Sequence, residues 1–422
     1  MEDLDPTGPT SVTLLGQKLV AWKPPHSDRY AVFLDQCPHR LAPLSEGRID
    51  EKTGHLMCSY HGWQFDSQGI CTHIPQAENP EIITQNRLHY CVTALPTQQA
   101  NGLLWVWPDA NFSDIAKTQP LPLSPLIDAS RGFVWSSMVR DLAYDWQTLI
   151  ENVADPSHVP FAHHGVQGNR NQAQPLPMEI IESTQHRMEV QSGGRLQSRI
   201  TFTPPCHLEY SIHLGNDRQV GLITYCLPVS PGKSRIVAQF SRNFAHGLHR
   251  WIPRWWNHIA VRNAVLDGDM VLLHHQERAL QQHPAQTWKT AYKLPTSADR
   301  LVVEFRKWID RYCGGEVPWG KLDSSASMVT LNRGEILDRY HQHTLLCSSC
   351  RQALNKVHQV QIGLLAYFPI AITIAAIMPD PLRLSIGLPF GLTALMGLGL
   401  YAGLKYWLEP KFHFVDYIHS KR

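Results

Sequence analysis

Four side chains in the first part of the chain have the types and spacing of ligands to a metal cluster. Cys37 and His39 stand in the segment Cys-Pro-His-Arg, and Cys58 and His61 stand in Cys-Ser-Tyr-His-Gly-Trp. Each cysteine precedes its histidine by two or three residues, so two short loops can bring two thiolates and two imidazoles to one place. This set suits a two-iron, two-sulfide cluster in which the cysteines hold one iron and the histidines hold the other.

A zinc ion is the alternative occupant, because two cysteines and two histidines also satisfy its preferences. Zinc fingers place cysteine with cysteine and histidine with histidine, whereas the two residue types are interleaved here. The interleaved order favours a cluster with two chemically distinct irons, the Rieske [2Fe–2S] cluster, over zinc or over an unrelated set of buried side chains. The predicted cluster ligands are Cys37, His39, Cys58 and His61.

A second group of candidate ligands, Asp155, His158 and His163, lies in the middle of the chain. Two imidazoles and one carboxylate suit a mononuclear Fe(II) whose other positions stay open for O₂. On an undistorted helix the two histidines would point roughly 140° apart, so Pro160 must kink or end the helix for both to reach one metal. Asp155 stands three residues before His158, so it can instead hydrogen-bond a ligating imidazole and face a neighbouring domain.

The carboxylate ligand must then come from later in the chain, where a helical stretch carries Leu266, Met270 and Leu273 as an apolar stripe. Asp269 lies within or beside this stripe and should face the core. A carboxylate in the core requires a metal or a cation. Asp267 is the competing candidate, and we expect it to be a solvated charge or a charge at the helix amino end. We therefore predict Asp269 as the third ligand.

The remaining pattern predicts an α+β protein of three parts. Residues 10–107 read as short strands separated by Gly, Pro and Asp, which predicts an all-β domain over residues 1–115. A proline-rich boundary follows at 108–130, and residues 130–350 mix strand-like and helical runs, as in an α+β domain. Strand-like runs fall at 199–202, 219–225 and 234–240, and helical ones near 140–153, 250–281 and 327–345.

Two uncharged apolar runs, 362–378 and 384–404, follow this domain. Each is long enough to cross the hydrocarbon layer, and the short link 379–383 predicts a hairpin with both ends on one side. We expect two transmembrane helices over 360–405 with a short carboxyl-terminal tail. Lys and Arg flank the hairpin, which places the catalytic domains on the cytoplasmic or stromal side. A buried helical hairpin in a soluble core is the alternative, disfavoured by the length of the runs and their lack of a polar face.

Cys347 and Cys350 form a Cys-x-x-Cys pair just before the hairpin. Such a pair can be a redox-active dithiol, half of a zinc site, or two inert thiols. No second pair stands nearby in the sequence, so a zinc site would need partners from elsewhere in the chain.

Composition excludes several other classes of protein. The formal net charge of +2 and the absence of Lys/Arg runs give no support for nucleic-acid binding. Nine cysteines in 422 residues are too few for a disulfide scaffold and fit a reducing compartment. The acidic start lacks the basic and apolar regions of a signal peptide. No flavin or nicotinamide motif is found, so NAD(P)H electrons should arrive through a separate ferredoxin and its reductase.

The order of these motifs resembles the Rieske non-haem iron oxygenases. Within them the chain is most similar to the pheophorbide a oxygenase group, which includes chlorophyllide a oxygenase and a Rieske protein of the chloroplast envelope, and the likeness extends to the tail. The resemblance implies a helix-grip-like catalytic domain, one [2Fe–2S] cluster and a mononuclear Fe(II). Its implied ligands are Cys37, His39, Cys58 and His61 for the cluster, and His158, His163 and Asp269 for the iron.

The resemblance also implies roles for three further residues. Asp155 would pass electrons from the cluster of one subunit to the iron of the next in a head-to-tail homotrimer. Cys347 and Cys350 would form a redox switch that thioredoxin-type proteins reduce. The alternative is that they are two inert thiols.

We therefore expect an enzyme, a membrane-anchored Rieske-type monooxygenase that uses O₂ and ferredoxin-derived electrons. The resemblance implies a hydrophobic chlorin substrate such as pheophorbide a or a chlorophyllide, a place in chlorophyll metabolism, and a thylakoid or plasma membrane of a photosynthetic cell. The alternatives are an oxygenase of a sterol or another lipid, a Rieske electron carrier, and a redox-sensing membrane subunit that uses Cys347 and Cys350.

Overall fold

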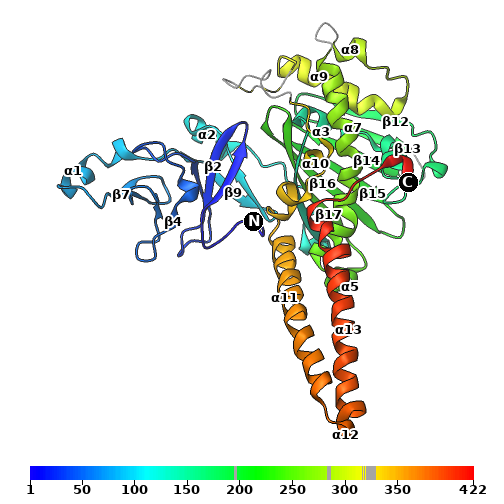
Figure 1. The fold of residues 1–422 in the computed structure, drawn as a ribbon. Helices are drawn as coiled ribbons and strands as arrows, with labels where there is room; N and C mark the ends of the chain where they lie inside the picture. The colour runs from blue at the N-terminus through cyan, green and yellow to red at the C-terminus, as the bar shows by residue number, and fades with distance from the viewer. Residues whose placement is uncertain (194–196, 283–286, 316, 318, 320–328) are drawn as a thin grey trace.

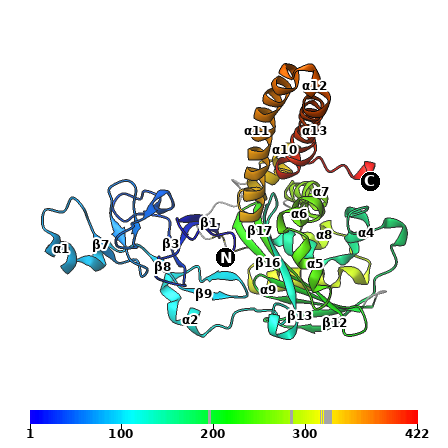
Figure 2. The same ribbon diagram turned by 90° about the horizontal axis from the view of Figure 1, so that it is seen from below.

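The structure, a computed structural model, describes residues 1–422 except 194–196, 283–286, 316, 318 and 320–328. Figure 1 shows a β-rich amino-terminal part in blue and cyan, beside a larger part built on one broad sheet. Two long helices project away from the broad sheet and run side by side in both views (Figures 1 and 2). The predicted fold class, α+β with an all-β amino-terminal part and two apolar carboxyl-terminal helices, is confirmed.

The amino-terminal part contains two small antiparallel sheets among its described residues. One sheet has the strand order β1 (Thr10–Leu14), β2 (Gln17–Trp22), β3 (Ala31–Leu34) and β8 (Ala94–Leu95). The other has the order β4 (Arg48–Ile49), β5 (Leu56–Met57), β6 (Gln64–Phe65) and β7 (Cys71–His73). Fully buried Trp22, Phe33 and Phe65 belong to one hydrophobic cluster that joins the two sheets, so this part has a core of its own. A hairpin of β9 (Thr97–Ala100) and β10 (Leu103–Val106) follows.

The larger part is built on an antiparallel sheet of seven strands in the described residues. Their order is β11 (Val134–Leu142), β17 (Lys233–Arg242), β16 (Gln219–Ser230), β15 (His207–His213), β14 (Gln197–Thr203), β13 (Met188–Gly193) and β12 (Met178–Ser183). Helices α3 (Trp146–Ala154), α7 (Asn263–Gln281) and α9 (Arg300–Tyr312) share one hydrophobic core with this sheet. Figure 1 shows α3 and α7 lying over the sheet, and the predicted iron ligands lie just after α3 and on α7.

Two predicted helical stretches differ from the structure. The stretch near 140–153 becomes a helix only at Trp146, because the residues before it pair with β17 as part of β11. The stretch near 250–281 is interrupted by Pro253. Its pieces are α5 (His246–Trp251), α6 (Arg254–Asn257), a π-helical turn at His258–Arg262, and α7.

The predicted stretch 327–345 begins outside the described residues, at 327 and 328. Its described part holds the short helix α10 (Arg333–Ile336) and a π-helical turn at Tyr340–Thr344. This stretch is therefore two short helical turns that lead to the long helices, and not one continuous helix.

The two long helices are α11 (Ser348–Ile377) and α13 (Leu388–Gly403), with α12 (Asp380–Leu382) between them. Two continuous helical segments, Ser348–Ile377 and Asp380–His413, are long and apolar enough to cross a membrane. Their apolar side chains are largely exposed, as for Ile362 at 68% and Met396 at 73%. After α14 (Pro410–His413) the chain packs back onto the larger part, where Tyr417 is buried.

Candidate metal centres

The two predicted cluster loops lie in the amino-terminal part, the first between β3 and β4 and the second between β5 and β6. Their backbones match: the Leu41 N–H donates to the Cys37 carbonyl at 2.8 Å, and the Gly62 N–H donates to the Cys58 carbonyl at 2.9 Å. Leu41 and Gly62 both have positive φ, 60° and 72°. Two equivalent tight turns therefore present the two cysteines in the same way.

The predicted cluster ligands meet in two pairs, Cys37 with Cys58 and His39 with His61. Cys37 and Cys58 are each 2% exposed, and the rings of His39 and His61 lie 4.4 Å apart with His39 at the surface. Trp63 stacks on His39 at 4.7 Å. Burial raises the pKa of the Cys37 thiol to about 12, so its thiolate requires a metal partner. Buried sulfurs with imidazoles toward solvent fit a Rieske cluster.

The central histidines are carried by two short helical turns rather than by one helix. Helix α3 ends at Ala154, and the Asp155 carboxylate accepts the Ser157 N–H at 2.7 Å to begin the turn Pro156–His158. The four-residue helix α4 (Val159–Ala162) follows and places His163 after it. The two histidines therefore stand on different turns, and Pro160 lies in the first turn of α4 instead of kinking or ending a longer helix.

His158, His163 and Asp269 form a compact group. The two Nε2 atoms are 3.1 Å apart. The Asp269 carboxylate lies 3.7 Å from the Nε2 of His158 and 3.4 Å from that of His163. His158 Nδ1 hydrogen-bonds the main-chain carbonyl of Asp155, which assigns the proton to Nδ1 and leaves the Nε2 lone pair facing the group. The donor set fits a mononuclear iron.

Burial shapes the protonation of this group. His163 is 2% exposed, and burial, reinforced by His158, lowers its pKa to about 3. Burial also raises the pKa of Asp269 to about 6, against the opposing effects of His158 and a hydrogen bond from Asn152. The His158 side chain keeps 22% of its surface exposed. The group is therefore closed on the His163 side and open beside His158.

Asp155 does not join this group directly. Its carboxylate lies 3.9 Å from His158 Nδ1 and caps the following turn, while its carbonyl makes the hydrogen bond to that nitrogen. The expected contact to a ligating imidazole therefore comes from the main chain of Asp155. About a quarter of its side chain, 26%, remains exposed.

The carboxyl-terminal tail supports the site, a role that the sequence analysis missed. Tyr417 donates its hydroxyl hydrogen to the Ala162 carbonyl at 2.8 Å, and His419 Nε2 donates to the Gly268 carbonyl at 2.9 Å. A Cβ added at Gly268 would lie 2.8 Å from the Ala162 carbonyl oxygen and 3.0 Å from His163 Nδ1. Glycine at this position lets α7 approach the histidine segment closely.

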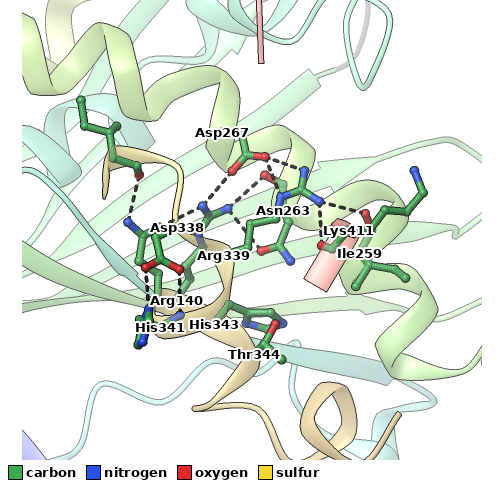
Figure 3. A network of polar contacts seen from close by, with 12 residues as sticks. Arg140, Ile259, Asn263, Asp267, Asp338, Arg339, His341, His343, Thr344 and Lys411 are labelled. Atoms are coloured by element: carbon green, nitrogen blue, oxygen red, sulfur yellow. Dashed lines mark hydrogen bonds and ion pairs between the residues drawn. The ribbon is translucent and has the colours of Figure 1, made fainter. Parts of the chain in front are cut away.

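The expectation that Asp267 is a solvated charge is wrong. Asp267 is fully buried, with its carboxylate 2.7 Å from Arg140 Nη2 and 2.8 Å from Arg339 Nε. Arg140 also donates to the main-chain and side-chain oxygens of Asn263, as Figure 3 shows. Two guanidinium groups compensate the buried carboxylate. Asp267 therefore fixes α7 against β11 and sets the position of Asp269 two residues later.

The Cys-x-x-Cys pair lies at the start of α11 and belongs to neither of these groups. Cys347 and Cys350 are completely buried and unbridged. The structure brings His258 and His343 to them, partners that the sequence analysis did not find. His343 stands four residues before Cys347, a spacing that offered one signal in the sequence.

The chain is similar to known proteins over nearly its whole length. Residues 1–96 match the family model of the Rieske [2Fe–2S] domain, and residues 202–287 match that of pheophorbide a oxygenase. A chloroplastic pheophorbide a oxygenase of Oryza sativa subsp. japonica is 37% identical over 446 residues, covering 100% of this chain and 83% of the relative. A chloroplastic flavonoid 8-hydroxylase 2 of Ocimum basilicum is 33% identical over 454 residues, covering 99% and 83%.

Among solved structures, dicamba monooxygenase bound to dicamba has a similar fold. The match has a TM-score of 0.59 and covers 72% of this chain and 92% of that chain. Sequence identity is 20%, so this likeness concerns the fold alone.

Proposed function

Because this chain belongs to the pheophorbide a oxygenase-like group of Rieske oxygenases, oxidoreductases with a [2Fe–2S] cluster and a mononuclear iron, we propose that it oxygenates a hydrophobic chlorin. Pheophorbide a and chlorophyllide are the candidates, and the first is the substrate in the name of the rice relative. The observation that carries this proposal is the group His158, His163 and Asp269, with one side open, in a chain that also carries a Rieske domain.

The proposal assigns each metal to residues of this chain. The mononuclear iron is assigned to His158, His163 and Asp269, and when bound it would supply open coordination positions for O₂. The Asp155 carbonyl orients His158, and the Asn152 amide orients the Asp269 carboxylate. The cluster is assigned to Cys37, His39, Cys58 and His61, whose sulfurs are buried.

Electron supply requires partners. We assign it to a ferredoxin and its reductase, since the sequence carries no flavin or nicotinamide motif. Asp155 borders the open side of the iron site and stays partly exposed, so it can meet a neighbouring subunit. This supports a head-to-tail homotrimer in which Asp155 links one subunit's cluster to the next subunit's iron.

The long helices support a membrane location. Apolar side chains such as Ile362, Leu384 and Met396 are exposed at 68%, 78% and 73%, surface that lipid would cover. We place the anchor in the thylakoid or plasma membrane of a photosynthetic cell, with the iron sites on the stromal or cytoplasmic side. The rice and basil relatives are chloroplastic by name. An anchored enzyme can take an apolar substrate directly from the bilayer.

The test is product formation under ¹⁸O₂. Full-length protein, loaded with iron and reduced through ferredoxin, is incubated separately with pheophorbide a, chlorophyllide a and a flavone. We expect a chlorin product that carries ¹⁸O by mass spectrometry. His158→Ala should abolish that product while the cluster's spectrum is unchanged, and His164→Ala, which alters the adjacent exposed segment, should retain it. Product formation by His158→Ala would show that oxygenation does not depend on this group. No labelled product from the unaltered protein with any of the three substrates, although its cluster is reduced, would favour an electron carrier.

A flavonoid is the second candidate substrate, because the basil flavonoid hydroxylase aligns with 99% of this chain. Labelled flavone without labelled chlorin in the same experiment would favour this candidate and refute the chlorin.

A further inference from the structure

Four buried side chains from three segments meet at the base of the long helices. His258 comes from the π-helical turn before α7, His343 from the turn before α11, and Cys347 and Cys350 from the start of α11. Their ligand atoms all lie within 4.8 Å of one another. Cys350 Sγ is 3.3 Å from His343 Nε2 and 3.6 Å from His258 Nδ1, and Cys347 Sγ is also 3.6 Å from His258 Nδ1. This Cys₂His₂ group is distinct from the iron-site ligands.

The far nitrogens of both imidazoles are fixed by backbone carbonyls of β11. His258 Nε2 lies 3.1 Å from the Ser137 carbonyl oxygen, and His343 Nδ1 lies 2.6 Å from that of Val139. A carbonyl only accepts hydrogen bonds, so these nitrogens carry the protons. The nitrogens that face the sulfurs are then unprotonated. Backbone carbonyls orient metal-binding histidines in the same manner.

The group is closed to solvent. Cys347, Cys350 and His343 have no exposed surface, and His258 is 2% exposed. Thiol–disulfide exchange requires an accessible sulfur, which neither cysteine offers in this structure. Two sulfurs and two imidazole lone pairs directed at one buried point instead match the ligand set of a structural zinc ion.

We propose that His258, His343, Cys347 and Cys350 form a four-coordinate structural zinc site. The ion would join the start of α11 to the segment before α7, and through the two histidines to β11. It lies where the long helices leave the larger part of the molecule (Figure 1). The site therefore fastens the helical hairpin to the sheet.

The first experiment measures metals in purified full-length protein. Expression with zinc and iron in the medium should give about one zinc per chain beyond the iron complement. X-ray absorption at the zinc edge should show two sulfurs at about 2.3 Å and two nitrogens at about 2.0 Å. Protein with full iron and no zinc, iron in place of zinc in this coordination, or a Cys347–Cys350 disulfide in anaerobically purified protein would overturn the proposal.

A second cluster could take up zinc adventitiously, since His358, Glu409 and His413 also place ligand atoms within 4.8 Å of one another and are only half-buried. Zinc bound there would show nitrogen and oxygen neighbours without sulfur. That spectrum would refute the Cys₂His₂ site even at full zinc stoichiometry.

Variants distinguish a loss of zinc binding from a general loss of folding. Cys350→Ser and His343→Ala should each lower the zinc content at least tenfold. Cys313→Ser, which alters a cysteine outside the group, should retain zinc. Iron content is the second readout and should persist in any variant that folds, because the iron ligands lie elsewhere. If both site variants fail to fold, the absorption spectrum of the unaltered protein decides, and zinc retained in folded variants contradicts the assignment.

Discussion

Two groups of candidate metal ligands in this molecule are built alike but differ in exposure. The open group is His158, His163 and Asp269, and the closed group, at the base of the long helices, is His258, His343, Cys347 and Cys350. A main-chain carbonyl fixes one imidazole of the first group, that of His158, and carbonyls fix both imidazoles of the second, so that the lone pairs face the other donors. The first group has three donors and a partly exposed histidine, whereas the second has four donors, including two sulfurs, and almost no exposed surface. Donor number and solvent access, more than residue type, distinguish a site suited to a reaction from one suited to holding segments together.

The largest effect should come from Asp269→Asn, which removes a donor from the open group while keeping its shape. Oxygenation should fall below detection and mononuclear iron should be lost, with the cluster's spectrum unchanged. Because burial raises the pKa of Asp269 to about 6, the neutral amide should not destabilise the metal-free fold. Iron analysis and O₂ uptake provide the measurements. Normal turnover in this variant would show that Asp269 is not an iron ligand.

Asp267→Asn is the matched change two residues away and should act on stability. It leaves Arg140 and Arg339 without their buried counter-charge, and breaking such a pair costs about 3–5 kcal/mol. Denaturant unfolding followed by circular dichroism measures this loss. Unfolding equal to that of the unaltered protein would show that the arginines are satisfied without Asp267.

Asp155→Ala should have an intermediate effect on turnover, because Asp155 lies at the open edge of the site but is not one of the assigned iron ligands. If Asp155 links subunits, turnover should fall about 10–100-fold while both metals are retained. Loss of the cap itself costs about 1 kcal/mol. Asp128→Ala removes a similar cap at Ser130 in another segment and is the control. Equal turnover in the two variants would leave Asp155 with only its capping role.

The smallest effect is expected for Tyr417→Phe. The change removes the hydroxyl that donates to Ala162 and should lower stability by about 1 kcal/mol. Tyr406→Phe, at a side chain that is exposed, should have no measurable effect. Thermal unfolding of both variants tests whether the tail supports the histidine segment, and identical melting temperatures would contradict it.

The contrast between the two groups also explains what the sequence could predict. His158 and His163 lie within one short segment, and the cluster loops repeat a local Cys–His pattern, so the spacing of the two motifs taken together was enough to predict their chemistry. His258 is far in sequence from Cys347, and only the folded chain shows that they meet.

The different partners of Asp267 and Asp269 were harder to predict from the sequence. Both are buried, and an apolar stripe cannot tell a carboxylate that faces two arginines from one that faces two histidines. Periodicity correctly indicated Asp269 as a core residue and failed for Asp267, because Arg140 and Arg339 come from distant segments. The supporting role of Tyr417 was likewise invisible in the sequence, since it depends on the path of the chain after the long helices.

That path sets an order of assembly. Tyr417 and His419 follow both long helices in the chain, yet they brace Ala162 and Gly268 beside the central histidines. During synthesis these braces emerge from the ribosome only after the hairpin has been made. A nascent chain therefore contains both long helices before the contacts of Tyr417 and His419 beside the central histidines can form.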